Sequence, residues 1–330
     1  MAAEVTNPLP GVPLVESPFF ERFFPPDGTD PALLAVARQL RQDGFAVIDF
    51  PDPDFDRRAE ALCGRLRDRF DWAAWRERGQ VGRMQDLWRE EPEVRAIATN
   101  AAVIDLLSRL YGRRAWPFQT LTFPVGSQQP YHSDAVHFSS APERFLCGVW
   151  VALEDVDESN GPLVYYPGSH RWPILGLDQL GRNRPEGKPS QIAFHEAWRA
   201  LVALHGVEPR RFHARRGQAL IWAANLLHGG ELHRDRARSR WSQVTHYYFD
   251  DCLYYTPMGS LPLAGQVQYR TPLDIATGQP VPGSLNGRPL DRDFREGALA
   301  GDWRPLRMLR RALAWRLGRR GRPAAAPEGE

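Results

Sequence analysis

Lysine is almost missing from this chain of 330 residues, which contains Lys188 alone and takes every other basic residue as arginine. A coding bias toward GC-rich codons explains that preference without any function, so a single arginine is weak evidence for an anion-binding site. Net charge is also nearly missing, at +2 with histidine neutral. Proteins that bind nucleic acid usually concentrate basic charge, so this balance predicts no nucleic-acid partner.

Cysteines are few, and the three that occur, Cys63, Cys147 and Cys252, form no CxxC pair. An odd, unpaired set argues against a disulfide framework and a cysteine-based zinc site, and it fits a reducing compartment. No apolar run approaches the length of a membrane span, about 18 residues. The first residues also lack the basic start and apolar core of a signal peptide, so we expect a cytoplasmic protein.

An arm, one large domain and a basic tail are the expected organisation. Residues 1–29 are rich in proline and phenylalanine and are predicted to form an irregular arm before a domain over 30–302. In the tail, 303–330, residues 303–322 hold eight arginines, no acid and a leucine stripe at helical spacing. Such a helix either contacts an anionic membrane surface through 304–322 or docks on its own domain with its arginines in water.

The first third of the domain is predicted as a helical layer with one strand. Asp30-Pro31 provides the N-cap and the first-turn proline of a helix that runs through Leu40. Apolar residues at helical spacing predict two further helices, from Phe55 to Phe70 and from Glu91 to Tyr111. The apolar run from Gly44 to Phe50 is bounded by glycine and proline, which predicts a strand.

From Trp116 to Phe249 the pattern changes to short β-prone runs separated by glycine and proline. The predicted strands include Leu146–Leu153, a turn–strand–turn unit over 160–170, a pair over Arg211–Trp222 that turns at Gly217, and a last strand over Trp241–Phe249. Many short strands of this kind are typical of a double-sheet jelly roll of the cupin type, the double-stranded β-helix. The predicted fold class is mainly β with α, a jelly roll with a helical N-terminal layer and a helical insertion.

The insertion is one long segment that interrupts the strands. Residues 174–207 begin as a polar loop and end in a predicted helix from Phe194 to His205. A connection of that length inside a domain is more often functional than filler. We therefore expect a lid over the site.

One stretch of the predicted barrel brings a histidine and a carboxylate together. After an alternating strand and a Gly/Ser/Gln/Pro turn, the sequence continues as Tyr131-His132-Ser133-Asp134. Residues i and i+2 of an extended segment point to the same face, so His132 and Asp134 can face one point. They supply two members of the 2-His-1-carboxylate group that binds non-haem Fe(II) and leaves coordination positions open. His228, on a distant predicted strand, is the candidate for the third.

A second His-x-Asp pair tests this interpretation. Nine histidines and 40 acidic residues produce about one such pair by chance, and the chain contains another in His233-Arg234-Asp235. Only His246 follows this second pair, too soon for a new sheet layer to form between them. We interpret the pair at 132–134 as part of the metal site and the pair at 233–235 as part of a solvated loop.

Five markers occur in order between Gly44 and Tyr248. They are the strand at 44–48, Tyr131-His132-Ser133-Asp134, the block from Asn160 to His170, Leu227-His228-Gly229-Gly230, and the run from Arg240 to Tyr247. In this order they resemble the phytanoyl-CoA dioxygenase family of Fe(II)/2-oxoglutarate oxygenases. The resemblance implies that His132, Asp134 and His228 bind iron.

The resemblance also implies a site for 2-oxoglutarate. The family places an arginine about a dozen residues after the second iron-binding histidine, and Arg240 matches that position. Its planar guanidinium fits a carboxylate through two parallel hydrogen bonds, and Ser242 on the same strand face adds a hydroxyl. Arg238 is the competing candidate, but it lies in the polar loop before the strand.

Two further positions match family residues near the cofactor, Trp150 and Gln119. Each has a structural alternative, because a strand tryptophan often belongs to the core and a glutamine can bond the backbone. Among the remaining histidines, His170 is expected to bond loop carbonyls and His246 to pack in the barrel. His137 is expected at the mouth of the site.

The expected activity follows from the resemblance. An enzyme of this kind uses Fe(II), 2-oxoglutarate and O₂ to hydroxylate a small-molecule or lipid-like substrate, with release of succinate and CO₂. Two hypotheses keep the fold without that chemistry. One is a cupin-fold metal-dependent isomerase or hydrolase, in which Arg240 has no purpose, and the other is a non-catalytic binding module, which a complete ligand set disfavours.

Overall fold

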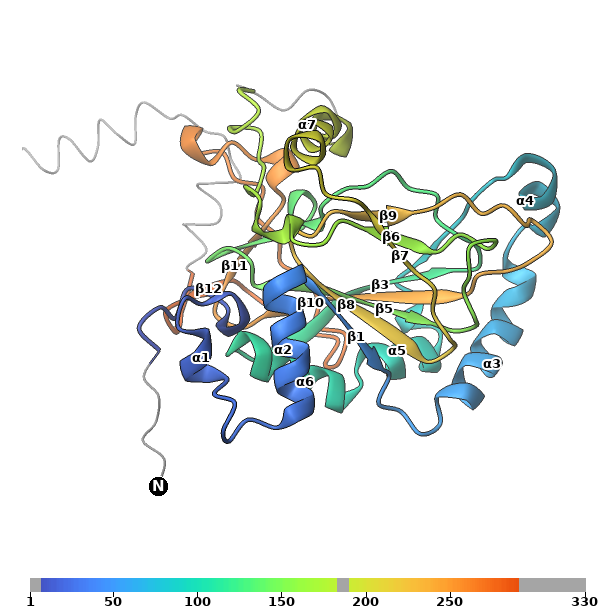
Figure 1. The fold of residues 1–330 in the computed structure, drawn as a ribbon, viewed down its shortest axis with the longest axis horizontal. Coiled ribbons are helices and arrows are strands. Elements are labelled where there is room, and N and C mark those ends of the chain that lie inside the picture. The colour runs from blue at the N-terminus through green and yellow to red at the C-terminus, as the bar shows by residue number, and fades with distance from the viewer. Residues whose placement is uncertain (1–6, 183–189, 291–330) are drawn as a thin grey trace, which may run out of the picture.

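Two antiparallel sheets packed face to face form the body of the protein in a computed structural model that describes residues 7–182 and 190–290 (Figure 1). The larger sheet has six strands in the order β1-β8-β5-β10-β3-β2, and the smaller has three in the order β7-β6-β9. Helices cover the outer face of the larger sheet, and the smaller sheet lies over its other face. The predicted jelly roll with a helical N-terminal layer is confirmed.

The larger sheet is covered on both faces. Its strands are β1 (Phe45–Asp49), β2 (Met84–Gln85), β3 (Ala115–Phe123), β5 (Leu146–Ala152), β8 (Gln218–Ala223) and β10 (Ser242–Phe249). Every residue of β5 and β10 is buried. Because neither face meets water, β5 is continuously apolar instead of alternating, as its sequence predicts.

The strands of the smaller sheet show that the predicted pair over Arg211–Trp222 is divided between two sheets. The smaller sheet consists of β6 (Leu163–Tyr165), β7 (Arg210–Phe212) and β9 (His228–Gly230). Strands β7 and β8 flank the turn at Gly217 as predicted, but β7 pairs with β6 while β8 pairs with β1 and β5. Gly217 has a φ of +83°, a left-handed conformation that glycine adopts without a steric cost. The chain therefore changes sheets at this turn instead of forming a hairpin.

The helical layer is confirmed with changes at its boundaries. It contains α1 (Phe20–Phe23), α2 (Pro31–Asp43), α3 (Phe55–Leu66), α4 (Trp72–Arg78), α5 (Pro92–Ala98) and α6 (Ala101–Tyr111). The Asp30 side chain caps α2 by accepting a hydrogen bond from the Leu33 N–H. The helix predicted from Glu91 to Tyr111 is two helices, because Asn100 accepts from the Val103 N–H and begins a new one.

Several short elements were not predicted. The arm contains a 3₁₀ helix (Leu14–Glu16) and α1, and the side chains of Phe20 and Phe24 are buried in the core. The described part of the arm is thus more ordered than expected. Helix α4 and the two-residue strand β2 also escaped the sequence analysis, because each is too short to show a clear period.

The insertion between β6 and β7 carries α7 (His195–His205), which confirms the predicted helix. A 3₁₀ helix (Gln191–Phe194) precedes it, and Phe194 and Trp198 are buried in an apolar cluster against the domain. Residues 183–189, in the middle of the predicted lid, lie outside the described residues.

The last described segment adds small strands at the edge. Strand β4 (Ser139–Ala141) pairs with β11 (Leu253–Tyr255), and β12 (Ser284–Leu285) pairs with β13 (Arg288–Pro289). None of the described helices is long and apolar enough to cross a membrane. The predicted basic tail, residues 303–330, lies outside the described residues, so membrane contact through 304–322 stays a prediction.

Candidate active site

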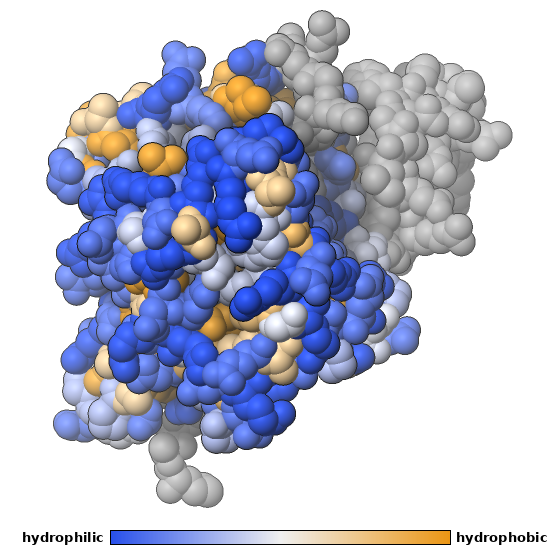
Figure 2. Space-filling model, turned by 90° about the vertical axis from the view of Figure 1, so that its right-hand side faces the viewer, coloured by the Kyte–Doolittle hydropathy of each residue, from blue (hydrophilic) through white to orange (hydrophobic). Residues whose placement is uncertain are grey.

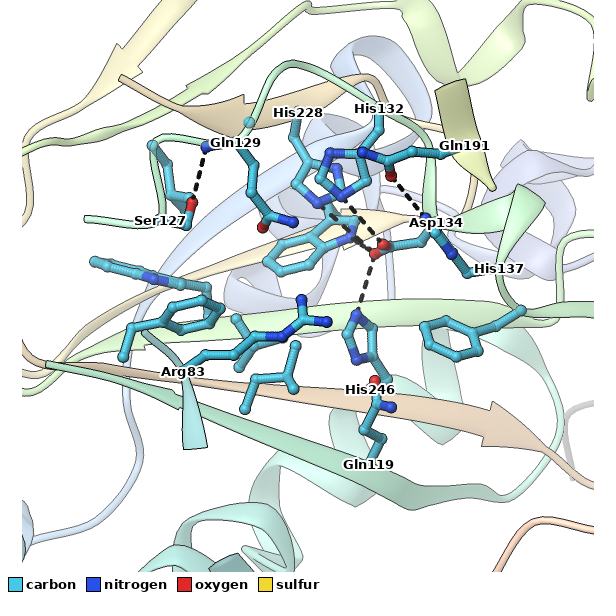
Figure 3. A pocket seen from close by; sticks show the side chains of 18 of the residues that line it. Arg83, Gln119, Ser127, Gln129, His132, Asp134, His137, Gln191, His228 and His246 are labelled. Carbon is cyan, nitrogen blue, oxygen red and sulfur yellow. Dashed lines mark hydrogen bonds and ion pairs between the residues drawn. The ribbon is translucent and has the colours of Figure 1, made fainter. Parts of the chain in front are cut away.

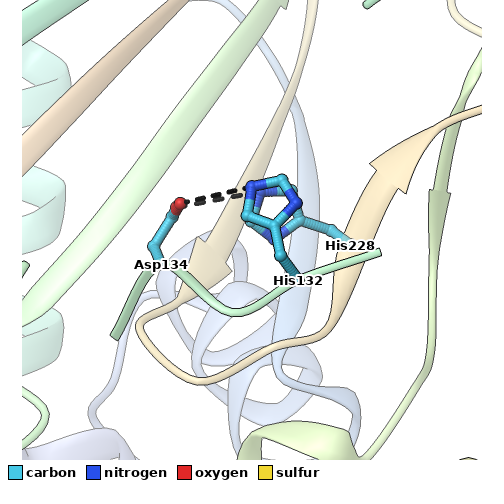
Figure 4. Close-up of side chains that lie close together, drawn as sticks. All are labelled: His132, Asp134 and His228. Carbon is cyan, nitrogen blue, oxygen red and sulfur yellow. Dashed lines mark ion pairs between the residues drawn. The ribbon is translucent and has the colours of Figure 1, made fainter. Parts of the chain in front are cut away.

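Three buried side chains, His132, Asp134 and His228, converge on one point (Figure 4). The two histidines are neighbours across a bridge in which each backbone N–H donates to the other residue's carbonyl, at 2.9 and 3.0 Å. Asp134 follows at the start of a 3₁₀ helix (Asp134–Val136) that the Ser133 side chain caps. One ligand atom from each of the three lies within 4.8 Å of the others. The structure thus brings together the residues that the sequence predicted as metal ligands.

Backbone carbonyls orient both histidine rings. Nδ1 of His132 lies 3.0 Å from the Pro130 carbonyl oxygen, and Nδ1 of His228 lies 3.0 Å from that of Leu226. Since a carbonyl oxygen only accepts, each Nδ1 carries a proton, which leaves Nε2 as the ring nitrogen that can bind a metal. The two Nε2 atoms lie 3.8 and 3.7 Å from the Asp134 carboxylate. Both Nε2 atoms therefore lie beside the carboxylate.

Burial and neighbouring charges set the protonation of this group. Burial, with a contribution from His228, lowers the pKa of His132 to about 3, so the ring is neutral at pH 7. Burial alone would raise the pKa of Asp134, but His228 and His246 outweigh it and hold that pKa well below its ordinary value. Neutral imidazoles and an ionised carboxylate are the forms that bind a divalent cation. The donor set fits Fe(II) with open coordination positions.

Two more side chains reach the same carboxylate, and Figure 3 shows one of them, His246. Nε1 of Trp222 donates to Asp134 Oδ2 at 2.8 Å, and Nε2 of His246 lies 3.2 Å from that oxygen. His246 is buried in the barrel as predicted, but its contact with Asp134 was missed. No local sequence spacing indicates it, because Trp222 and His246 come from different strands, β8 and β10, whose register decides the contact.

Arg240 lies in the same cavity and is only 1% exposed. Its Nε donates to the Gly161 carbonyl at 3.1 Å, and its Nη1 donates to the Ser242 hydroxyl at 2.5 Å. Burial lowers the pKa of Arg240 to about 10, against the opposing charge of Glu154, so the guanidinium stays charged at pH 7. Within residues 7–182 and 190–290, no carboxylate forms an ion pair with it. A buried, unpaired cation indicates a site for an anion.

The competing arginine is engaged elsewhere. Arg238 is partly exposed, and its Nη1 donates to Asp157 Oδ2 and to the Ser159 hydroxyl, both at 2.6 Å. Its charge is therefore already balanced at the surface. The geometry favours Arg240 as the anion-binding residue.

The cavity that contains these groups has a volume of about 380 Å³. Trp150 and Gln119 line it, and the Trp150 ring centre lies 5.5 Å from the Arg240 guanidinium carbon. Their contact with the cofactor stays a prediction. Six further polar residues of the lining were not predicted: Arg83, Gln85, Ser127, Gln129, Ser190 and Gln191. Figure 3 shows Arg83 reaching into the cavity; it comes from the segment leading into β2, which was not predicted.

His137 lies at the mouth as expected. It lines the cavity, and its Nε2 lies 2.8 Å from Oε1 of Gln191. This contact joins the segment after Asp134 to the segment that leads into α7 (Figure 3). The insertion thus reaches the rim of the cavity.

The remaining histidines have structural contacts. Nε2 of His170 lies 3.3 Å from the Arg41 carbonyl, in agreement with its predicted role. His233 is buried, so the prediction of a solvated loop is wrong for this residue. Its Nδ1 accepts from the Gly126 N–H at 3.1 Å, and its Nε2 lies 3.0 Å from the Asp235 carbonyl. The only potential metal-binding group among the described residues is that of His132, Asp134 and His228.

Residues 32–240 match the model of the phytanoyl-CoA dioxygenase (PhyH) family, which is more than half of the chain. The chain belongs to the phytanoyl-CoA dioxygenase family. The matched range contains His132, Asp134 and His228 and ends at Arg240.

Curated relatives agree with this assignment. The peroxisomal phytanoyl-CoA dioxygenase of Rattus norvegicus is 27% identical over 143 residues, which cover 41% of this chain and 37% of the rat protein. A probable phytanoyl-CoA dioxygenase of Caenorhabditis elegans is 28% identical over 144 residues, 41% of either chain. The matched part therefore spans less than half the length of each relative.

Solved structures with the same fold include two described as non-haem, α-ketoglutarate-dependent enzymes and one crystallised with 2-oxoglutarate. SnoN, described as an α-ketoglutarate-dependent epimerase from nogalamycin biosynthesis, has a TM-score of 0.53 at 22% identity, over 80% of this chain and 95% of SnoN. SnoK, described as a carbocyclase, has a TM-score of 0.54 at 17% identity, over 78% and 95%. EctD from S. alaskensis, crystallised with 2-oxoglutarate and 5-hydroxyectoine, has a TM-score of 0.51 at 20% identity, over 72% and 84%. At such identities the likeness shows a shared fold.

Proposed function

We propose that this protein is an Fe(II)/2-oxoglutarate-dependent dioxygenase that hydroxylates a small-molecule or lipid-like substrate. One observation carries the proposal: a single cavity holds both the His132–Asp134–His228 group and the unpaired cation of Arg240. The metal group alone fits many hydrolases, and the arginine alone fits any anion. Together they fit an oxoacid that meets a metal at one end and a guanidinium at the other.

Different residues of the cavity would bind the iron and the oxoacid. The imidazoles of His132 and His228 and the Asp134 carboxylate would hold iron and leave positions for the oxoacid and O₂. Arg240 binds the far carboxylate of 2-oxoglutarate, while its hydrogen bonds to Gly161 and Ser242 fix the guanidinium in place. When bound, iron would supply the activation of O₂, so that one oxygen atom enters succinate as 2-oxoglutarate loses CO₂ and the other enters a substrate C–H bond.

Hydroxylation of the substrate is the more specific part of the proposal. SnoN and SnoK are described as an epimerase and a carbocyclase, so the fold accommodates outcomes other than hydroxylation. We favour hydroxylation over halogenation because Asp134 occupies the coordination position that a halide would need. An isomerase or hydrolase without O₂ chemistry gives Arg240 no role, and a non-catalytic binding module needs no complete ligand set.

The other partners remain proposals from the sequence. We also propose a cytoplasmic location, because the three unpaired cysteines fit a reducing compartment. Membrane contact through residues 304–322 is tested by deleting 304–330 and measuring sedimentation with anionic liposomes. Retained sedimentation after the deletion would contradict it.

Succinate formation tests the proposed activity. With Fe(II), O₂ and 2-oxoglutarate, the wild-type protein should form succinate, and a panel of small-molecule and lipid-like substrates should stimulate it. Asp134→Ala is the matched control and should form none. Iron binding without 2-oxoglutarate binding would favour the isomerase or hydrolase, and a protein that binds neither would favour the binding module.

A further inference from the structure

The Asp134 carboxylate is held at one oxygen. Oδ2 accepts from Trp222 Nε1 at 2.8 Å and lies 3.2 Å from His246 Nε2, and all three side chains are buried. Each oxygen lies near one ligand histidine, Oδ1 at 3.8 Å from His132 Nε2 and Oδ2 at 3.7 Å from His228 Nε2. They differ in that, among the residues that the structure describes, no hydrogen-bond donor reaches Oδ1. We propose that Trp222 and His246 are positioning residues that occupy Oδ2, so that Asp134 binds the metal through Oδ1 alone.

Trp222 and His246 can both reach Asp134 because the residue between them on the sheet, Gly148, has no side chain. Trp222 on β8 and His246 on β10 are both paired with Gly148 on β5, the strand between them. Residues paired in this way project from the same face of a sheet. A Cβ added to Gly148 would lie 2.2 Å from Cε2 and Cζ2 of Trp222. The indole therefore occupies the space of the missing side chain, which brings it to the same oxygen as His246.

The same indole also supports a second metal ligand. The rings of Trp222 and His228 pack with centroids 4.6 Å apart, and those of Trp222 and His246 lie 6.1 Å apart at 82°. Removing the Trp222 hydrogen bond while keeping an aromatic ring therefore separates the contact with Asp134 from the packing against His228. Phenylalanine is the substitution that does this.

Occupation of Oδ2 bears on the chemistry of the metal. A carboxylate that binds through both oxygens fills two coordination positions, whereas a single oxygen leaves one more for an oxoacid or O₂. Partners that orient a ligand in this way typically change metal affinity by about 10–100-fold when they are removed. The inference rests on the proposed iron site and adds the groups that determine how Asp134 serves it.

The test measures metal binding and does not require activity. Trp222→Phe and His246→Phe should each weaken Fe(II) binding by about 10–100-fold in anaerobic titrations. The visible absorption of the Co(II)-loaded protein should also change in both variants, because Asp134 becomes free to bind through both oxygens. His246→Gln, whose amide keeps a donor, should retain most of the affinity and the wild-type Co(II) spectrum.

A matched control is Trp75→Phe. Trp75 is fully buried, and its Nε1 has no hydrogen-bond partner among the described residues, so this change removes an indole N–H outside the cavity. It should leave both the Fe(II) affinity and the Co(II) spectrum unchanged.

The outcomes distinguish this inference from the proposed function. If the wild-type protein binds no Fe(II), the proposed function itself fails. If the wild type binds and both phenylalanine variants bind equally well with unchanged Co(II) spectra, the positioning role alone is overturned. If His246→Gln loses affinity as His246→Phe does, a hydrogen-bond donor at this position does not maintain the affinity, which also overturns the positioning role. Should Trp222→Phe fail to fold, the His246 pair of variants decides.

Discussion

Two His-x-Asp motifs occur in this chain, and the structure uses them in opposite ways. His132 and His228 donate hydrogen bonds from Nδ1 to backbone carbonyls, and their Nε2 atoms face Asp134. His233 has both ring nitrogens engaged by the backbone, at Gly126 and Asp235. Both His132 and His233 are buried, so burial does not separate the two motifs. An Nε2 atom that faces a carboxylate does.

The largest expected effect is the loss of iron from variants of the metal-binding residues, with iron kept in variants of the second motif. His132→Ala, Asp134→Ala and His228→Ala should each lose stoichiometric Fe(II) with little change in fold, because each removes one of three donors. His233→Ala and Asp235→Ala should keep the iron, measured by metal titration of the purified variants.

A substitution at His233, in the second motif, should instead lower the stability of the protein. His233→Ala leaves the buried Gly126 N–H without its acceptor, at a cost of roughly 1–3 kcal/mol in the free energy of unfolding. Loss of iron from the 233–235 variants, with iron retained in His132→Ala, would show that the assignment is reversed.

Two neighbouring arginines offer the next comparison. Arg240→Leu should keep iron but weaken 2-oxoglutarate binding by roughly 2–5 kcal/mol, because a buried carboxylate loses its charged partner. Arg238→Leu removes an ion pair with Asp157 at the surface and should leave that binding nearly unchanged. Calorimetric titration with 2-oxoglutarate measures both. The reverse ranking would identify Arg238 as the anion site.

The His132–Asp134 motif and its distant partner His228 were predictable from the sequence, because they depend on local spacing and on strand order. The i, i+2 alternation puts His132 and Asp134 on one face, and His228 falls on a strand far enough along the chain to return to them. The contacts of Trp222 and His246 were not predictable in this way. They depend on the register of β8 and β10 against Gly148, which only the packed sheet determines.

The fold likewise contains features that were predictable from the sequence and features that were not. Strands and helices with a clear period were predicted, but two boundaries depended on a single residue. Asn100 caps a new helix where the apolar pattern runs on, so one helix was predicted instead of two. At Gly217 the chain changes sheets, and a turn signal does not distinguish that event from a hairpin.

A structural histidine should make stability depend on pH. Burial, with the charge of Arg171, lowers the pKa of His170 to about 4, whereas an unfolded chain titrates near 6.5. Between these values the unfolded state binds more protons, so this contribution is complete above about pH 6.5 and is lost as pH falls toward 4.

The loss from His170 amounts to about 3 kcal/mol at most. Urea denaturation of the wild type and His170→Gln across pH 4–7 measures it. The variant should show the weaker decrease in unfolding free energy toward low pH. Identical slopes would mean that His170 is already accessible to protons in the folded state.

The smallest effect concerns the rim, where the segment before α7 meets the cavity. Gln191→Ala removes the 2.8 Å contact with His137; a hydrogen bond of this kind contributes about 0.5–1.5 kcal/mol. Substrate-stimulated succinate release should therefore fall by roughly two- to tenfold in kcat/KM, while 2-oxoglutarate binding stays unchanged, because Arg240 lies deeper in the cavity. Ile192→Ala is the neighbouring control, since Ile192 is 73% exposed and does not line the cavity. If Gln191→Ala weakens 2-oxoglutarate binding as much as turnover, the segment supports the whole pocket and does not act as a lid on the substrate side.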